Sequence, residues 1–405
     1  MATSAERMRG WTGPAILSFG FRPFFLLAGI WAVLAMVLWI VMLSGHEVLP
    51  TAFDPVSWHA HEFLFGYLGA VIAGFLLTAV PNWTGRLPVT GWALAALAGL
   101  WLLGRLAVAL SAGLPPLAVA LADLSFAAAL AAVLGREIIA GKNWRNLPVL
   151  GLLALFLAGN AGFHLAAASG GWAAGSVALR AGLAAAVMLI SLIGGRIVPS
   201  FTRNWLAQRG VTRLPAPFGN GDRAVLAVTG AALLSWAFLP EAGATAVAAA
   251  VAGLAQAWRL SRWQGWRTGG EALVWVLHAG YAFVPLGFLA IASNWLGWLA
   301  PGAALHVWTA GAIGLMTLAV MTRASLGHAG RPLHAGPAIA LTYGGVILSV
   351  LARFAAGIWD GQMGLLHLAA TAWILAYAGF TAIYWPILTR PRAARKQPMR
   401  RPAAE

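Results

Sequence analysis

Apolar runs of about twenty residues recur along the whole 405-residue chain, separated by short polar segments. Each run is long enough to cross the roughly 30 Å hydrocarbon layer of a bilayer as an α-helix. The pattern therefore predicts an all-α, polytopic integral membrane protein with about twelve transmembrane helices. We expect these helices at residues 18–44, 59–81, 91–110, 114–140, 147–168, 174–199, 223–239, 243–262, 270–291, 301–322, 336–356 and 363–388.

Composition agrees with this pattern, because 60% of the residues are hydrophobic and only 9% are charged. An ordinary soluble domain carries about a quarter of charged residues. The chain has no cysteine, so any metal or haem must be held by histidine, methionine or carboxylate. No phosphate-binding P-loop, serine-hydrolase elbow or HExxH zinc motif is present, which argues against an ATP-driven pump, a serine hydrolase and a zincin.

The formal net charge of +15 follows membrane topology and does not indicate nucleic-acid binding. Lysine and arginine follow every second predicted helix, as expected of cytoplasmic loops. Both termini are therefore predicted on the cytoplasmic side, as a tail at 1–17, one transmembrane domain at 18–389 and a basic tail at 390–405. The intervening loops without lysine or arginine are residues 45–58, 111–113, 169–173, 240–242, 292–300 and 357–362.

Histidine is the most informative residue type, because imidazole is the commonest protein ligand for transition metals, and ionisable groups inside a membrane are functional candidates. Five of the nine histidines fall near the outer ends of four predicted helices, namely His59, His61, His164, His306 and His367. Facing side chains on several helices are how a bundle builds a cofactor site. The alternative is that each imidazole is satisfied by headgroups and water at the interface.

His278 is predicted near the middle of its helix, where it needs a partner and is a candidate ligand or proton-handling group. His59 and His61 are two residues apart, which points them about 200° apart on a helix. They are therefore expected to face one metal only if the helix begins between them. Glu62 follows directly, either orienting an imidazole or handling protons, or as a carboxylate favoured near a helix N-terminus.

Three arginines, Arg105, Arg180 and Arg353, fall in the outer halves of predicted helices. There a cation needs an acidic partner, water or a cofactor carboxylate such as a haem propionate. The alternatives are an ion pair with Asp123 or Asp360, or snorkelling to the interface. Asp123 is the deepest acid of the chain and a candidate proton relay.

Seven stretches spread over residues 18–388 resemble the NnrS family. They are residues 21–25 (FRPFF), 58–62 (WHAHE), 81–85 (PNWTG), 194–202 (GGRIVPSFT), 278–281 (HAGY), 306–311 (HVWTAG) and 321–328 (MTRASLGH). The resemblance implies a bacterial inner-membrane protein that contains haem b and copper and is linked to nitric oxide metabolism and nitrosative stress. It also implies metal or haem ligation by the motif histidines His59, His61, His278, His306 and His328.

We combine the motif and the topology into one set of expected site residues. Metal ligands are expected among His59, His61, His164, His278, His306 and His367. Cofactor contacts are expected from His278, His306, His328, Arg105 and Arg353. Glu62 and Asp123 are the expected catalytic carboxylates, because reduction of nitric oxide consumes protons.

The main functional hypothesis is a haem- and copper-containing protein that binds and reduces or detoxifies nitric oxide, as a nitric oxide reductase-like oxidoreductase. Its redox site would lie in the outer half of the bundle, and membrane quinol or another donor would supply electrons. One alternative is a proton-coupled transporter that uses His278, Asp123 and Arg105. Another is a haem-based nitric oxide sensor or scavenger without turnover.

Overall fold

A computed structural model gives the fold and describes residues 11–359 and 361–392. Within these residues the protein is helical and contains no strand. Most of the two predicted tails lies outside this part of the chain, because residues 1–10 and 393–405 are not described. Asp360, one of the acidic partners expected for an arginine, is also outside it.

Twelve continuous helical rods make up the described bundle, which confirms the number that the hydrophobic pattern predicts. Nine rods are single α-helices: α2 (Phe21–Leu43), α5 (Trp92–Ala109), α6 (Pro116–Ala140), α7 (Leu147–Ala168), α10 (Asn220–Phe238), α11 (Gly243–Ser261), α12 (Ala272–Trp295), α15 (Pro337–Ala355) and α16 (Met363–Thr389).

The other three rods each contain a π-helical segment between two α-helices. They are α3 (Pro55–His61) with η2 (Glu62–Tyr67) and α4 (Leu68–Thr84); α8 (Val177–Leu189) with η6 (Ile190–Gly194) and α9 (Gly195–Ala207); and α13 (Pro301–His306) with η8 (Val307–Leu315) and α14 (Met316–His328). A π-helical turn contains an extra residue, which rotates the side chains that follow it, and such turns are frequent at functional sites.

The first interrupted rod begins earlier than the sequence pattern predicts. Asp54 accepts a hydrogen bond from the backbone amide of Ser57 at 3.0 Å, and Pro55 fits the first turn, where its missing N–H costs nothing. The helix therefore starts before both His59 and His61. The helix does not begin between His59 and His61, so these two imidazoles are not expected to face one metal.

Ten of the rods in the described residues are long and apolar enough to cross a membrane. Helices α10 and α11 are not among the ten, but α10 packs against α8 and α11, and α11 packs against α12. Large apolar side chains point away from the bundle, since Leu106, Leu117 and Leu341 are 60%, 70% and 75% exposed. Such a surface suits lipid, and the chain is a multi-pass membrane protein.

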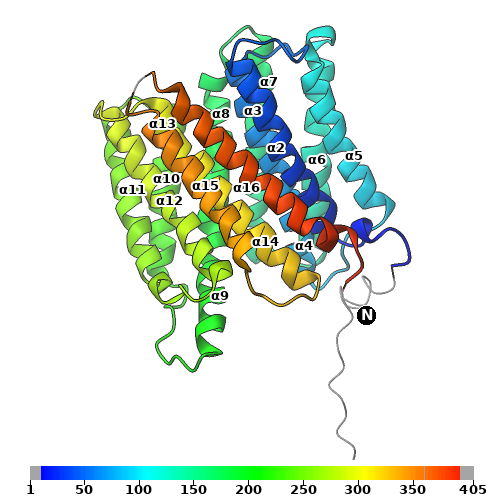
Figure 1. Cartoon of the computed structure of the whole chain (residues 1–405), viewed down its shortest axis with the longest axis vertical. Helices are drawn as coiled ribbons and strands as arrows, with labels where there is room; N and C mark the ends of the chain where they lie inside the picture. Colours follow the sequence, from blue (N-terminus) through cyan, green and yellow to red (C-terminus); the bar gives the residue numbers. More distant parts are fainter. Residues whose placement is uncertain (1–10, 360, 393–405) are drawn as a thin grey trace, which may run out of the picture.

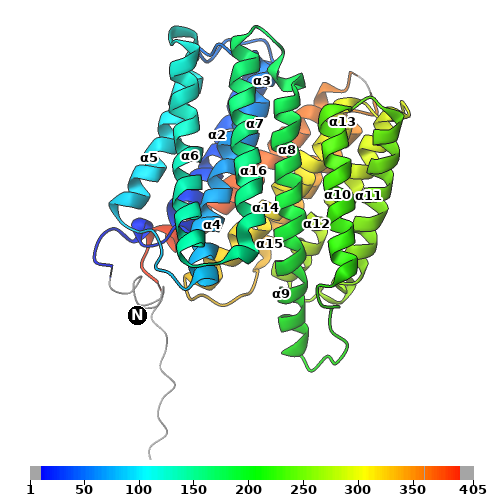
Figure 2. The same cartoon turned by 180° about the vertical axis from the view of Figure 1, so that it is seen from behind.

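The first and last rods lie side by side, with α16 packed against both α2 and α15 (Figure 1). The buried guanidinium of Arg22 joins them, because its Nη1 donates to the carbonyl oxygens of Leu388 at 3.0 Å and Arg390 at 2.6 Å. The described ends of the chain consequently lie at the same end of the bundle (Figures 1 and 2).

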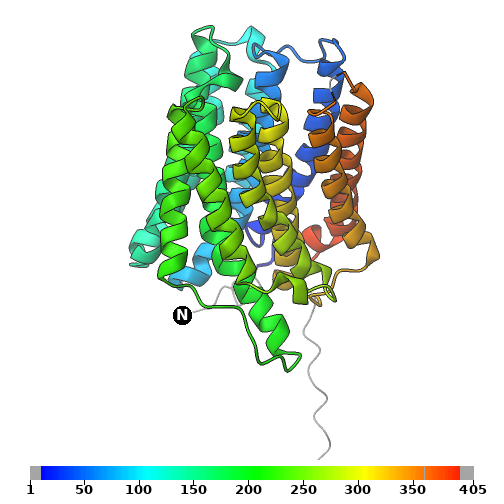
Figure 3. The ribbon, with the colours of Figure 1, turned by 90° about the vertical axis from the view of Figure 1, so that its left-hand side faces the viewer.

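Helices α5, α6 and α7 form one side of the bundle, and α10, α11 and α12 form the opposite side (Figures 1 and 2). The side view shows the rods running in one general direction (Figure 3). The two most buried rods run from Pro55 to Thr84 and from Pro301 to His328. In their apolar spans, 83% and 78% of the residues are buried. Two of the π-helical segments therefore lie in the protein interior, where they position the polar groups described next.

Candidate metal centre

Six buried polar side chains meet between the Pro55–Thr84 rod and helices α5, α6 and α7. They are His61 at the end of α3, Glu62 at the start of η2, Arg105 of α5, Asp123 of α6, and Asn160 and His164 of α7. We call this group the metal centre. None of the six is more than 6% exposed. Phe53 packs against both imidazoles, with ring centres 5.5 Å from His61 and 5.8 Å from His164, and helps to exclude water.

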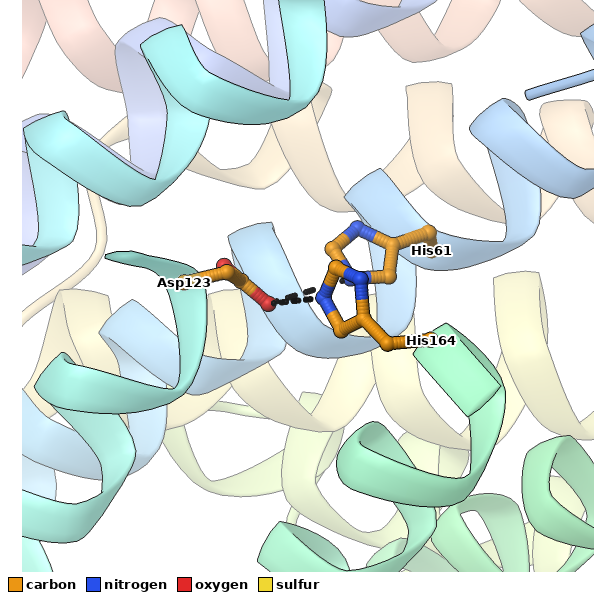
Figure 4. A group of neighbouring side chains, drawn as sticks. All are labelled: His61, Asp123 and His164. Atoms are coloured by element: carbon orange, nitrogen blue, oxygen red, sulfur yellow. Dashed lines mark hydrogen bonds and ion pairs between the residues drawn. The ribbon is translucent and has the colours of Figure 1, made fainter. Parts of the chain in front are cut away.

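The two imidazoles of the metal centre converge on one carboxylate oxygen (Figure 4). Nε2 of His61 lies 3.2 Å from Oδ2 of Asp123, and Nε2 of His164 lies 3.0 Å from the same oxygen. These three atoms all lie within 4.8 Å of one another. On the other side of its ring, Nδ1 of His61 is 3.0 Å from Oε1 of Glu62.

His61 faces oxygen atoms with both ring nitrogens. Nδ1 meets Glu62, while Nε2 meets Asp123 and also Oδ1 of Asn160 at 3.0 Å. A neutral imidazole has only one N–H, so its nitrogen lone pair would point directly at oxygen lone pairs of an ionised carboxylate. This arrangement needs one more positive charge, supplied by a second proton on the ring, by a proton on one of the two carboxylates, or by a cation between Nε2 and Asp123.

Arg105 links the two carboxylates. Its Nη1 donates to Oε1 of Glu62 at 2.7 Å, and its Nη2 donates to Oδ1 of Asp123. One guanidinium against two carboxylates leaves one negative charge in a nearly water-free site. A buried charge is stable only when it is paired, so this balance also calls for one more positive charge.

The donor set fits a metal ion. A tetrahedral ion with metal–ligand bonds of about 2 Å holds its ligand atoms roughly 3.3 Å apart, close to the 3.0 and 3.2 Å seen here. Two imidazoles and a carboxylate suit copper, zinc or iron. Glu62 accepts from the distal nitrogen of His61, as the outer-sphere carboxylates of metal-binding histidines do, and so leaves Nε2 free for a metal.

A second pair of histidines lies apart from the metal centre. His59 of α3 and His306 of α13 have ring centres 6.3 Å apart and ring planes within 11° of parallel. Nδ1 of His306 donates to the carbonyl oxygen of Gly302 at 2.6 Å, which leaves Nε2 available. Nδ1 of His59 is buried and has no hydrogen-bond partner among the described residues. We call these two residues the histidine pair.

Aromatic and basic side chains surround the histidine pair. The ring of Trp39 stacks on His59 with 4.4 Å between centres. Arg353 lies beside Gly302, because a Cβ atom on that glycine would be 2.8 Å from Nη2 of the arginine. Four of the five histidines expected in one layer thus form two separate sites, with His59 and His61 directed to different ones, as their 200° separation predicts.

Three predicted site residues do not join either group. His278 lies near the start of α12, not in mid-helix as predicted, and its Nε2 donates to Oγ1 of Thr202 at 2.7 Å. His328 packs on Phe19 and Phe21 at the end of α14. His367 is exposed near the start of α16. The structure therefore does not bring His278 or His328 to the outer histidines.

Arg105 and Arg353 also separate. Arg105 pairs with Asp123, which was the alternative to a haem propionate, whereas Arg353 lies by the histidine pair.

Asn160 was not predicted from the sequence. It lies one turn before His164 on the same helix and bonds to both His61 and Asp123. A lone amide in an apolar span is rare enough to have identified it.

The fold and the site define a multi-pass helical membrane protein with a buried histidine–carboxylate cluster suited to a metal ion. The family model described as NnrS protein matches residues 15–392. The chain belongs to the NnrS family, which is a metal-binding family, and membership fits a nitric-oxide-related membrane protein. A search of curated proteins found no match.

Replacing Arg105 by glutamine tests whether this guanidinium holds the metal centre together. The change leaves Glu62 and Asp123 buried without their cation, and we expect a loss of about 3–5 kcal/mol in the free energy of unfolding. Thermal unfolding in detergent measures it. The matched control is Arg86→Gln, because Arg86 pairs with Glu137 from a position 43% exposed, where about 0–1 kcal/mol is expected. Equal effects of the two changes would contradict the assignment.

Proposed function

We propose that the protein binds nitric oxide and reduces it at a copper ion held in the metal centre, with a haem b at the histidine pair. The observation that carries this proposal is the position of His61, whose two ring nitrogens both face oxygen atoms. In the metal-binding NnrS family, a metal cation is the better explanation of the required positive charge.

Copper would be held by Nε2 of His61, Nε2 of His164 and Oδ2 of Asp123. Asn160 and Arg105 each donate to the Asp123 carboxylate, which fixes its orientation. Glu62 orients the His61 ring through Nδ1. All the ligands come from rigid helices, so the donor positions are set before an ion binds.

The histidine pair would hold the haem iron. Nε2 of His306 is available, and Nδ1 of His59 is buried with no partner among the described residues. The two ring centres are 6.3 Å apart, with nearly parallel rings. Arg353 would then meet a haem propionate, and Trp39 would pack beside the ligand His59.

When bound, copper would supply the coordination of nitric oxide, and the haem iron would supply the transfer of electrons. The chain supplies the dry surroundings and the protons. Oε2 of Glu62 is buried and has no partner among the described residues, whereas both oxygens of Asp123 accept hydrogen bonds. Glu62 is therefore the proton-carrying group, and Asp123 is a ligand and positioning residue. This divides the roles of the two carboxylates that the sequence analysis treated alike.

The transporter hypothesis loses the site on which it depended. It required His278 together with Asp123 and Arg105, but His278 bonds to Thr202 on the side of the bundle that carries α12, while Asp123 and Arg105 lie on the opposite side (Figure 1). A haem-based sensor or scavenger uses the same two sites without turnover. Steady consumption of nitric oxide in the presence of a reductant distinguishes the enzyme from it.

Metal analysis of purified variants tests the two sites separately. We expect His164→Ala to lose copper and keep haem, and His306→Ala to lose haem and keep copper. The matched control is His367→Ala, because this exposed histidine contributes to neither site. Iron and copper contents and the optical spectrum, reduced and with nitric oxide, are the measurements. A colourless, metal-free wild-type protein, expressed with sufficient haem and copper, would overturn the proposal.

We also propose that the protein lies in the bacterial inner membrane with its metal sites toward the periplasm and quinol as a candidate electron donor. The loops that carry Lys142, Arg209, Arg267 and Arg331 lie at the end of the bundle where the described chain ends lie (Figure 1). Basic loops mark the cytoplasmic face. His59 and His306 lie toward the opposite end, on α3 and α13.

Thiol labelling measures this orientation directly, because the natural chain has no cysteine. We expect a membrane-impermeant thiol reagent, added to intact spheroplasts, to label Ala52→Cys and to leave Gln208→Cys unlabelled. Both positions are exposed. Ala52 lies in the loop between α2 and α3, and Gln208 directly follows α9, at the opposite end of the bundle (Figure 1). Labelling of Gln208→Cys alone would reverse the orientation.

A further inference from the structure

A small cavity adjoins the metal centre. It has a volume of about 10 Å³, enough for roughly one water-sized molecule. Arg105, Asp123 and Asn160 form its polar wall, and Phe65, Gly69 and Ile72 are among the residues of its apolar wall. We call it the inner cavity. A molecule held there would touch residues of the metal centre directly.

A second, larger cavity of about 80 Å³ lies between α4, the rod of α8, η6 and α9, and α14. We call it the outer cavity. Thr317 contributes the only side-chain hydroxyl among its lining residues, and that hydroxyl already bonds to the carbonyl oxygen of Ile313 at 2.6 Å and to the hydroxyl of Tyr67 at 2.6 Å. A water molecule needs two to four polar partners. The outer cavity is therefore dry and suited to an apolar guest.

One side of the outer cavity opens toward the lipid. Phe75, Ile193 and Val320 line it from three different rods, and each is partly exposed at the surface of the bundle. All three positions lie well inside segments that are long and apolar enough to cross the membrane. The opening therefore faces the hydrocarbon layer and not water.

Ile72 separates the two cavities. It lines both of them and is 9% exposed. A change of its side-chain rotamer, which takes nanoseconds or less in mobile positions, is a small motion compared with the movement of a helix. No charged or polar side chain lies among the residues lining the outer cavity apart from Thr317.

We propose that these two cavities form a route by which a small neutral gas enters the metal centre from the bilayer. Such a molecule dissolves in hydrocarbon, enters past Val320, occupies the outer cavity and passes Ile72 to reach Arg105 and Asp123. The route rests on the proposed function for the identity of the gas as nitric oxide. It excludes ions and water, which find no partners along it.

Xenon tests the outer cavity independently of any metal. Crystals of the wild-type protein under xenon pressure are expected to hold xenon beside Leu76 and Met316, as apolar cavities in other proteins do. Crystals of Val320→Trp are expected to lose it. A lipid acyl chain or ordered water occupying the outer cavity, with no xenon bound, would overturn the proposal.

The rate of nitric oxide binding tests the route. In stopped-flow mixing of the reduced, metal-loaded protein with nitric oxide, we expect Val320→Trp to slow association about tenfold, and Ile72→Ala to accelerate it. Val228→Trp is the matched control, because Val228 is equally apolar and partly exposed but lines neither cavity. If Val320→Trp does not fold, Ile193→Trp blocks the same opening.

The outcomes separate this proposal from the proposed function. If the protein is metal-free but binds xenon, the outer cavity is supported as a gas site, and the identification of the gas as nitric oxide is refuted. A metal-loaded protein that binds nitric oxide equally fast in the wild type, Val320→Trp and Ile72→Ala would keep the metal site and contradict the route.

Discussion

Among the described residues, Arg105 carries the only guanidinium that contacts Glu62 and Asp123, and the candidate metal centre depends on this contact. Two carboxylates in a region without water repel each other strongly, and each loses its hydration. Arg105 offsets one of their charges and fixes both carboxylates in place. The remaining negative charge lies between His61 and His164, where a cation fits. In the proposed function, this remaining charge is what would attract a metal ion.

The π-helical segment η2 helps to make this arrangement. His61 and Glu62 lie at the junction of α3 and η2, and both are completely buried. Gly66 lies four residues after Glu62 in the same segment, and it lets Arg105 and Glu62 approach, because a Cβ atom there would lie 2.5 Å from Nη1 of the arginine. The same rod sends His59 toward His306. One rod thus contributes to both the metal centre and the histidine pair.

Much of the fold was predictable from the sequence, because apolar runs of transmembrane length and alternate basic loops determine the rods and their order. The pairing of Arg105 with Asp123 was also among the alternatives, since a cation in a membrane has few partners. The grouping of the histidines was not predictable in full. Depth along the membrane normal places His164 and His306 in the same layer, but it does not say which rods are neighbours.

Two further errors have local physical causes. His278 was predicted near mid-helix in a helix over residues 270–291, whereas α12 begins at Ala272 after the cap Glu271 and continues to Trp295, so His278 lies in its second turn. Asn160 was not predicted because its amide does not ionise, although it contacts both His61 and Asp123. The π-helical segments have no simple hydrophobic period, so the directions of side chains beyond them needed the structure.

Copper X-ray absorption spectroscopy of the purified wild-type protein tests the central claim most directly, because it reports the atoms bound to the metal. We expect nitrogen and oxygen donors at about 2 Å, with the outer-sphere scattering of two imidazoles, from His61 and His164. Sulfur donors from methionine, or protein free of copper after expression with copper present, would contradict a metal centre built on His61, His164 and Asp123.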